Sequence, residues 1–572
     1  MGYRKLFPAC LFCLLLLLSQ CRPAREAAVD GFHYTGTKKL EVSNGAVVSA
    51  HPLASAAGLL ALQRGGNAFD AAIATQLALA VVYPQAGNIG GGGFLVAQRA
   101  NGESLALDYR ETAPAAAHRD LYLDAQGNVH PTKSLSGHLS VAVPGTVAGL
   151  FETHRYARLP FRQLIEPAIR LAENGFAITA AEAANLNRFR DSFIKYNTVP
   201  VAVVRNRIWN AGDTLRQPEL AATLRRIRDA GVDGFYRGET ARMLLDEMQR
   251  GGGLITANDL EHYKAKWRTP LSFSYRGNTV LSMPMPSSGG TLLLQMLRMS
   301  EPFPLASYGH NSPAAVQLMT EVERRAFADR AAHMGDADFY PVPDSVLIDG
   351  AYLRNRMRDF VPGKASSSTG VGAGTIPPRT SDQTTHLSVI DREGNAVSVT
   401  TTLNNYYGSK TVAGGAGFFL NDEMDDFSAK PGAPNLFGAV GGEANAIAPG
   451  KRMLSSMTPT IVLRNGKPWI VVGTPGGTTI PTSVFQTLVN LIDFGLDADA
   501  AVNRPKFHHQ WLPDLVEVER SFPVELRKQL EAMGYALHER PTLGRVELIV
   551  REANGAIIAV ADGRGDDAAA GY

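Results

Sequence analysis

Two neighbouring stretches in the C-terminal half of the chain alternate between apolar and polar residues, with the period of two that β-strands show. They cover residues 384–391 and 396–404, and the sequence Asp-Arg-Glu-Gly joins them. Aspartate at the first position of a type I turn and glycine at its fourth are typical of a hairpin loop that ends in a bulge. The pattern therefore predicts an antiparallel hairpin in which Asp391 pairs with Asn395.

This register brings three polar side chains together at the open end of the hairpin. It places Thr384 directly across from Thr402, and Asn404 falls on the same face. A hydroxyl residue that starts an internal strand suggests a nucleophile that becomes N-terminal when the chain cuts itself after Gln383. The new α-amine, with a pKa of about 7.7–8.0, would then take the hydroxyl proton, which the amide of an uncut chain cannot do. The alternative is that Thr384 is an ordinary strand residue.

The remaining pattern predicts a mixed α/β chain. Residues 54–82 have the periodicity of a helix, which Arg-Gly-Gly at 64–66 breaks. The Ser/Gly/Pro-rich residues before Thr384 predict a flexible connector, which a self-processing chain would need. In order, the predicted elements are helical residues 54–82, a loop over 83–93, strands at 94–99 and 105–109, mainly helical residues 146–265, the connector 366–380, and short strands with glycine-rich turns after the hairpin.

Composition narrows the class of protein. The 572 residues, 45% of them hydrophobic, can bury a large core in more than one folding unit. The formal net charge is only +2 and no long basic run occurs, so we expect no nucleic-acid partner. The 56 glycines favour a protein of sheets and loops over a helical bundle.

Residues 1–21 predict an export signal. Arg4 and Lys5 precede an apolar run over 6–18 that is short for a membrane-spanning helix. All three cysteines lie in this segment, so the mature chain has neither disulfides nor a thiol catalyst. We expect a periplasmic or secreted protein. Cys21 follows a lipoprotein-like box and is a candidate lipid anchor, although Gln20 departs from the small residue usual there.

Five stretches in a fixed order carry further motifs. They are Pro-Gln-Ala-Gly-Asn-Ile-Gly-Gly-Gly-Gly-Phe at 84–94, Leu-Asp-Tyr-Arg-Glu at 107–111, the block from Gln-Thr-Thr-His at 383–386 to Asn-Asp-Glu-Met-Asp-Asp-Phe-Ser at 421–428, Lys-Arg-Met-Leu-Ser-Ser-Met at 451–457, and Gly-Thr-Pro-Gly-Gly at 473–477. Together they resemble the bacterial γ-glutamyltransferase (γ-glutamyl transpeptidase) family over nearly the whole mature chain. The resemblance implies an α/β N-terminal nucleophile hydrolase fold, a four-layer αββα sandwich. It also implies self-cleavage into a large subunit, 22–383, and a small catalytic subunit, 384–572, that form a heterodimer from one precursor.

The resemblance also implies roles for particular residues. Thr384 is the expected nucleophile and Thr402 its orienting partner, in agreement with the hairpin register. Gly476 and Gly477 are expected to donate backbone N–H groups to the oxyanion of the transition state. An isolated Gly-Gly pair is otherwise an ordinary tight turn.

The expected substrate pocket has opposite charges for the two ends of an amino-acid head group. Arg110 would bind the α-carboxylate of a γ-glutamyl group through a bidentate pair. The other expected contacts are Ser455 and Ser456 to the same carboxylate, and Asn404, Glu423 and Asp426 to the α-ammonium. Outside this context, an arginine at a strand end and an acidic pair three residues apart are usually solvated.

No cofactor and no metal are expected. The glycines at 90–93 lack the following Lys-Ser/Thr of a phosphate loop and are expected to allow close backbone packing. His386 is expected to be structural. In the segment 431–442, which resembles the lid loop of the family, Phe437 stands where many members have a tyrosine that can donate a hydrogen bond.

The expected activity is cleavage of glutathione and other small γ-glutamyl compounds through an ester on Thr384, with transfer to water or to the amine of an amino acid or peptide. The acceptor, the ratio of hydrolysis to transfer and the physiological substrate stay open. One alternative is an acylase for a different side chain, such as a cephalosporin acylase. A second is a surface-binding protein without catalysis. The presence of both Arg110 and Asp426 speaks against the former, and the set of Thr384, Thr402 and the Gly-Gly pair against the latter.

Overall fold

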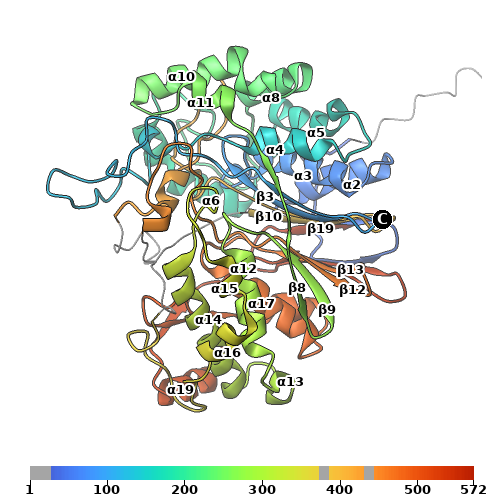
Figure 1. The fold of residues 1–572 in the computed structure, drawn as a ribbon. Helices are drawn as coiled ribbons and strands as arrows, with labels where there is room; N and C mark the ends of the chain where they lie inside the picture. The colour runs from blue at the N-terminus through green and yellow to red at the C-terminus, as the bar shows by residue number, and fades with distance from the viewer. Residues whose placement is uncertain (1–27, 373–384, 431–442) are drawn as a thin grey trace, which may run out of the picture.

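Two seven-stranded sheets packed face to face form the centre of the protein, with helices on both outer faces (Figure 1). The computed structural model describes residues 28–372, 385–430 and 443–572. The predicted four-layer αββα sandwich is confirmed. We call the two sheets upper and lower, as Figure 1 draws them.

The upper sheet contains the predicted hairpin. Its strands, in spatial order, are β19 (Ala568–Gly571), β2 (Ala46–Ser49), β10 (Thr385–Ile390), β11 (Ala396–Thr402), β3 (Gly92–Gln98), β4 (Ser104–Asp108) and β7 (Lys266–Arg268). β10 and β11 are antiparallel, and Thr385 pairs with Thr401, which confirms the predicted register. The turn is also as predicted, because the Gly394 N–H donates to Asp391 O at 3.1 Å and Gly394 has φ 91°.

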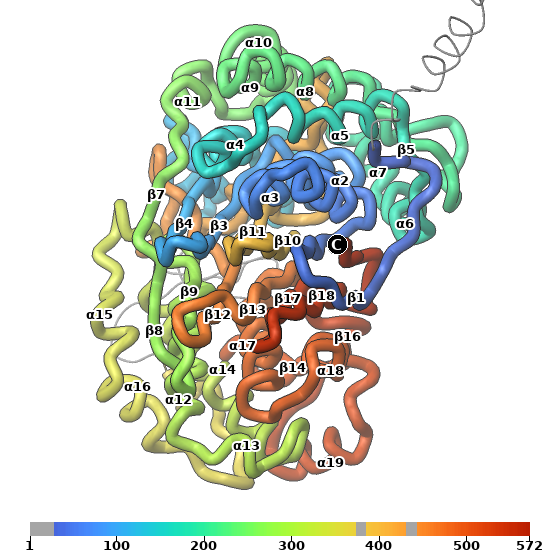
Figure 2. Tube along the Cα trace, turned by 90° about the vertical axis from the view of Figure 1, so that its right-hand side faces the viewer, coloured from blue at the N-terminus to red at the C-terminus, as the bar shows by residue number. Residues whose placement is uncertain are grey.

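The lower sheet is built from both halves of the chain. Its spatial order is β1 (Lys39–Val42), β18 (Ile557–Ala561), β17 (Glu547–Arg551), β13 (Lys467–Gly473), β12 (Thr460–Arg464), β9 (Asn278–Ser282) and β8 (Leu271–Tyr275). The first and last described strands, β1 and β19, therefore lie beside strands from the opposite end of the chain (Figure 2). Segments on both sides of residue 384 are thus needed to complete each sheet.

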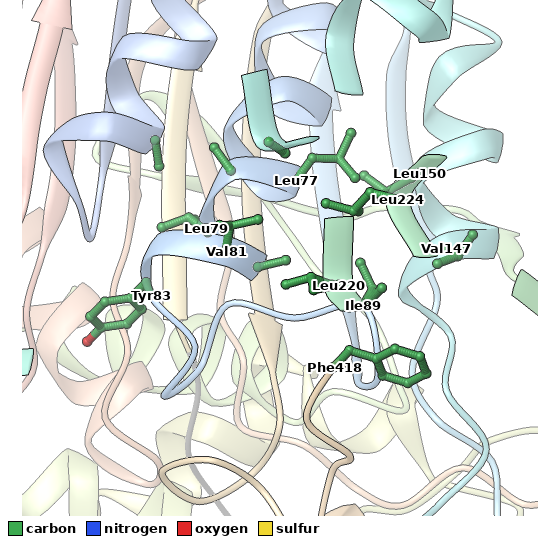
Figure 3. Close-up of a cluster of buried hydrophobic side chains, with 14 of the residues drawn as sticks. Leu77, Leu79, Val81, Tyr83, Ile89, Val147, Leu150, Leu220, Leu224 and Phe418 are labelled. Atoms are coloured by element: carbon green, nitrogen blue, oxygen red, sulfur yellow. The ribbon is translucent and has the colours of Figure 1, made fainter. Parts of the chain in front are cut away.

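Helices of the N-terminal part cover the upper sheet. They are α2 (Pro52–Gln63), α3 (Ala68–Val82), α4 (Thr146–His154), α5 (Phe161–Asn174), α6 (Ala180–Arg188), α7 (Arg190–Tyr196), α8 (Pro218–Ala230), α9 (Asp233–Tyr236), α10 (Gly238–Gly251) and α11 (Ala257–His262), with a small sheet of β5 (Phe176–Ala177) and β6 (Thr214–Leu215). The sequence predicted this helical region and the break between α2 and α3. Apolar residues of α3 such as Leu77 and Val81 pack with Leu220, Leu224 and Phe418 (Figure 3).

The helices under the lower sheet come from the middle and the end of the chain. They are α12 (Gly289–Ser300), α13 (Leu305–Tyr308), α14 (Pro313–His333), α15 (Asp344–Leu347), α16 (Gly350–Arg356), α17 (Thr479–Ile492), α18 (Ala498–Asn503) and α19 (Val524–Ala532), with a third sheet of β14 (Phe507–His508), β15 (Val516–Glu519) and β16 (Leu537–Arg540). Between the two large sheets lies a separate apolar layer that includes Val48, Val96, Ile461, Val471 and Ile549. Because successive side chains of a strand point to opposite faces of its sheet, one face of each large sheet packs against helices and the other against this apolar layer.

Two expectations need correction. β11 ends at Thr402 rather than at 404, because Asn404 has φ 70°, which is incompatible with a strand. The connector is not flexible over its first residues: Ser368 is 2% exposed, its N–H donates to Asp514 Oδ2 at 2.7 Å, and its hydroxyl donates to Trp511 O at 2.5 Å. These partners lie about 140 residues away in sequence, so local composition did not indicate them.

Candidate active site

The start of β10 and the end of β13 meet at one end of the sandwich. A Cβ on Gly473, the last residue of β13, would lie only 2.2 Å from Cε1 of His386, so the two strands approach closely there. The turn Thr474–Gly477 follows directly and leads into α17. Thr384 and Gln383 lie outside the described residues, as do Cys21 and Phe437. The position of Thr384 opposite Thr402 therefore stays a prediction from the sequence.

Thr402 and Asn404 are coupled by a hydrogen bond in the buried end of the hairpin. The Asn404 N–H donates to Thr402 Oγ1 at 2.7 Å, and Asn404 Nδ2 donates to Asp422 O at 3.0 Å. Asn88 Nδ2 donates to Thr402 O at 2.7 Å and holds the strand end from the other side. The Oδ1 atom of Asn404 is buried and accepts no hydrogen bond within the described part of the protein. This atom is therefore available to a ligand donor.

Arg110 lies two residues beyond the end of β4 and is fully buried among carboxylates. Its Nη1 donates to Glu423 Oε1 and its Nη2 to Asp426 Oδ2, both on the short 3₁₀ helix η2 (Glu423–Asp426). A third carboxylate, that of Glu111, has its Oε2 3.6 Å from Nη1. The backbone fixes the arginine as well, because its carbonyl accepts the Tyr263 hydroxyl at 2.8 Å. One guanidinium thus faces three buried carboxylates.

The excess of carboxylates shifts the pKa values in this cluster. Burial raises the pKa of Glu111 to about 8, although the charge of Arg110 opposes the shift. Burial and the charge of Glu111 together raise the pKa of Glu423 well above its usual range. Burial disfavours the charge of Arg110, but Glu423 and Asp426 outweigh it and raise the arginine pKa above its usual value. At neutral pH these shifts favour the protonated forms of Glu111 and Glu423.

Several acceptor atoms of the cluster have no donor. Both carboxylate oxygens of Glu111 and Oε2 of Glu423 are buried and accept no hydrogen bond from any described residue. Buried acceptors are almost always paired in folded proteins, so this arrangement indicates a missing donor. An ammonium group carries three N–H donors and one positive charge, and it fits this need.

Ser455 and Ser456 lie on the segment that also contacts Arg110. Arg110 Nε donates to Met453 O at 3.3 Å and Nη2 to Leu454 O at 3.4 Å, immediately before the two serines. Ser455 Oγ accepts the Met457 N–H at 3.1 Å, while Ser456 Oγ accepts from Arg330 Nη2 at 2.9 Å. Arg330 adds a second buried cation near this segment. The two serines directly follow the backbone carbonyls that Arg110 contacts, and their role in binding a carboxylate stays a prediction.

Gly476 and Gly477 form the turn that precedes α17. Gly476 has φ 141° and Gly477 φ 65°, values that favour glycine, and a Cβ on Gly476 would lie 2.4 Å from Thr479 Oγ1. The Gly476 carbonyl accepts the Thr479 hydroxyl at 2.7 Å, which fixes the turn. The two glycines directly precede the N-terminus of α17, a place where backbone donors and the helix dipole favour negative charge.

His386 lies between the two sheets and serves packing. Its Nδ1 contacts Thr400 Oγ1 at 2.9 Å and its Nε2 contacts Ser388 Oγ at 3.1 Å. Burial lowers the pKa of His386 to about 3, so the ring is neutral at physiological pH. This agrees with its expected structural role.

The sequence pattern missed the involvement of Glu111 and Asp422. Glu111 belongs to the Leu-Asp-Tyr-Arg-Glu motif, but its approach to Glu423 spans more than 300 residues of sequence. Gly92 makes room for it, because a Cβ there would lie 2.5 Å from Glu111 Oε2. Asp422 holds Asn404 through its carbonyl and Asn405 through its carboxylate. The run of acidic residues that starts at Asp422, directly before Glu423, is the sequence signal that could have indicated Asp422.

Two general features of the described residues complete the description. None of their helices combines the length and apolar character needed to cross a bilayer. In the same ranges, no three His, Cys, Asp or Glu side chains are grouped as a metal site requires.

Comparison with known proteins yields one consistent family. A family model described as Gamma-glutamyltranspeptidase matches residues 54–572. The glutathione hydrolase proenzyme of Escherichia coli K12 is 45% identical over 547 residues, covering 95% of this chain and 93% of its own. Among solved structures, a cephalosporin acylase from Bacillus halodurans has a TM-score of 0.83 at 27% identity, covering 94% of this chain and 98% of its own. A Helicobacter pylori gamma-glutamyltranspeptidase chain has a TM-score of 0.55 at 44% identity, covering 57% of this chain and 94% of its own.

Proposed function

The chain belongs to the γ-glutamyltranspeptidase family, and we propose that it cleaves glutathione and other γ-glutamyl compounds and transfers the γ-glutamyl group to water or an amine. The observation that carries this choice of substrate is a set of buried acceptors without donors among the described residues. They are Glu423 Oε2 and both oxygens of Glu111, next to the Arg110 guanidinium, together with Asn404 Oδ1. An α-ammonium would satisfy the acceptors, and an α-carboxylate would bind Arg110, Ser455 and Ser456. A γ-glutamyl group carries both.

The reaction begins at Thr384 once the chain has been cut after Gln383. The Thr384 hydroxyl attacks the γ-carbonyl of the substrate, and its proton passes to the α-amine of the same residue. The backbone N–H groups of Gly476 and Gly477 stabilise the tetrahedral oxyanion. The C–N bond then breaks, the departing nitrogen receives the proton, and a γ-glutamyl ester remains on Thr384. Water or an amine attacks this ester and restores the hydroxyl.

Thr402 positions the nucleophile rather than reacting. The sequence predicts that it lies opposite residue 384, and its hydroxyl accepts the N–H of Asn404, the residue proposed to contact the α-ammonium. Binding of the α-ammonium and orientation of the Thr384 hydroxyl are therefore coupled through Thr402 in this proposal.

Processing and location belong to the same proposal. The precursor loses its export signal and yields a large subunit of 22–383 and a small subunit of 384–572; if Cys21 carries a lipid, the signal ends before Cys21 and this residue stays as the first of the large subunit. Each large sheet contains strands from both pieces, which keeps them together as a heterodimer. The mature protein acts in the periplasm or outside the cell, with Cys21 as a candidate lipid anchor.

A pair of chromogenic substrates tests the proposed substrate class. γ-Glutamyl-p-nitroanilide and glutaryl-p-nitroanilide differ only in the α-ammonium. We expect kcat/KM to be larger for the γ-glutamyl compound by a factor on the order of 10⁴, because the glutaryl compound has no α-ammonium and leaves the buried acceptors unpaired. Equal values for the two anilides would instead identify an acylase of the cephalosporin type, the alternative that the Bacillus halodurans structure represents. Absence of cleavage of either compound would favour a protein without catalysis.

A further inference from the structure

Arg330 lies on α14, a helix beneath the lower sheet (Figure 1), and points into the protein interior. The residue is only 1% exposed. Its Nη2 donates to Ser456 Oγ at 2.9 Å and its Nε to Ser288 Oγ at 2.8 Å. This guanidinium thus contacts one serine of the proposed carboxylate pocket and a second serine from a different part of the chain.

Ser288 connects Arg330 to the other serine of the pocket, Ser455. It lies directly before α12, and its N–H and its hydroxyl both donate to Ser455 O, at 2.8 and 2.7 Å. The Ser455 N–H donates in turn to Pro286 O at 2.9 Å. All three serines are buried. The guanidinium therefore holds Ser456 through its hydroxyl, and Ser455 through Ser288 and the backbone.

The bond from Arg330 changes what the Ser456 hydroxyl can do. A hydroxyl has one proton and two lone pairs. When one lone pair accepts a hydrogen bond from a cation, the O–H group becomes a stronger donor, because neighbouring hydrogen bonds polarise one another. The same bond restricts the hydroxyl proton to directions away from the guanidinium. A substrate carboxylate that accepts from Ser456 therefore meets a donor that is already oriented.

Arg330 also adds to the positive charge on the serine side of the pocket. Arg110 is paired with the carboxylates of Glu423 and Asp426, so part of its charge is offset within the protein before a substrate binds. Arg330 donates to two neutral hydroxyls, one of which belongs to Ser456. Because electrostatic attraction is stronger in a buried site than in water, a second cation behind the serines favours a bound carboxylate.

We propose that Arg330 is a positioning residue for recognition of the substrate α-carboxylate. It orients the Ser456 hydroxyl toward the carboxylate and, through Ser288, fixes the backbone of Ser455. The inference rests on the proposed function, because it takes the carboxylate to lie at these serines. It makes α14, in the predicted large subunit, a determinant of specificity for a pocket whose serines belong to the predicted small subunit.

Kinetics with two anilides test this role. γ-Glutamyl-p-nitroanilide carries the α-carboxylate, whereas 4-aminobutyryl-p-nitroanilide lacks it and keeps the ammonium. The variants are Arg330→Met, Arg330→Lys, Ser456→Ala and the double variant that combines Arg330→Met with Ser456→Ala. Arg325→Met is the matched control, because Arg325 lies on the same helix, is equally buried and donates to Glu321 and Asp359 instead.

We expect Arg330→Met to raise KM for the γ-glutamyl anilide by about tenfold, the effect of one weakened charged hydrogen bond, with little change in kcat. Its kcat/KM for the aminobutyryl anilide should equal that of wild type, and Arg330→Lys should recover part of the loss. Arg325→Met should lower the unfolding temperature without raising KM. Because Arg330 acts through Ser456 in this proposal, adding Arg330→Met to Ser456→Ala should raise KM by less than about threefold.

A wild-type KM in Arg330→Met, or a rise in KM that is just as large in the Ser456→Ala background, would overturn the inference. If Arg330→Met does not fold, Ser288→Ala decides instead. It removes one hydroxyl from the same chain of hydrogen bonds and should raise KM by about fivefold, so an unchanged KM in this variant would also overturn the inference. A wild type that cleaves no γ-glutamyl compound would overturn the proposed function itself.

Discussion

Replacing Arg110 with lysine keeps the positive charge of the cluster but removes its planar fork. Arg110 donates to Glu423, Asp426 and the carbonyls of Met453 and Leu454 through three nitrogens. A lysine ammonium is a single point with three donors and cannot reach all four positions. It also cannot bind an α-carboxylate through two parallel hydrogen bonds, as a guanidinium can, so the variant loses at least one charged hydrogen bond to the bound substrate, a loss of about 1.5–3 kcal/mol.

That loss corresponds to a rise of KM for γ-glutamyl-p-nitroanilide by about 10- to 150-fold. In this proposal Arg110 binds the α-carboxylate equally in the substrate complex and in the transition state of acyl transfer. Its replacement should therefore change kcat much less than KM. Arg325→Lys is a matched control, because Arg325 is equally buried and its Nη1 and Nη2 donate to Glu321 and Asp359. Both variants should unfold at lower temperature than wild type, but only Arg110→Lys should bind substrate poorly. A normal KM in Arg110→Lys would refute the assignment of the α-carboxylate to this residue.

Three further predictions concern neighbouring groups. The pKa of Glu111 is raised to about 8, so its carboxylate gains its charge mainly between about pH 7 and pH 9. KM for the substrate ammonium should fall over this range, and Glu111→Gln should flatten this part of the profile. Thr402→Val leaves the buried Asn404 N–H without its acceptor, which should lower the free energy of unfolding by about 1–3 kcal/mol in denaturant and also lower kcat. Thr402→Ser should keep both the stability and the kcat of wild type. An unaffected kcat in the valine variant would argue against a positioning role. Gly476→Ala places a methyl group 2.4 Å from Thr479 Oγ1 at a residue with φ 141°, so the turn must move. We expect kcat to fall by about 10²-fold or more with little change in KM. A variant with the kcat of wild type would exclude Gly476 as an oxyanion donor.

The hairpin shows what local sequence can predict. Strand periodicity and the Asp391–Gly394 turn chemistry are both short-range, and together they determined the register that the structure has. The end of β11 escaped the pattern, because the positive φ of Asn404 follows from contacts with Asp422 rather than from the strand itself.

The charged cluster shows where sequence reasoning stops. The motifs indicated Arg110, Glu423 and Asp426 as site residues. They did not indicate that Arg110 pairs with both carboxylates or that Glu111 lies next to it. Such contacts depend on the packing of η2 against the end of β4, across more than 300 residues of chain. The anchoring of Ser368 by Trp511 and Asp514 is hidden for the same reason.

The most direct test of the account is the N-terminal sequence and intact mass of the small fragment of the purified protein. The account predicts two fragments from wild type, with Thr384 as the first residue of the smaller one. Thr384→Ala should give a single uncut chain without activity on γ-glutamyl-p-nitroanilide, because it lacks the hydroxyl that makes the cut and the ester. An uncut but active wild-type protein, or a cut Thr384→Ala chain, would contradict the claim that this one residue is both the cleavage point and the nucleophile.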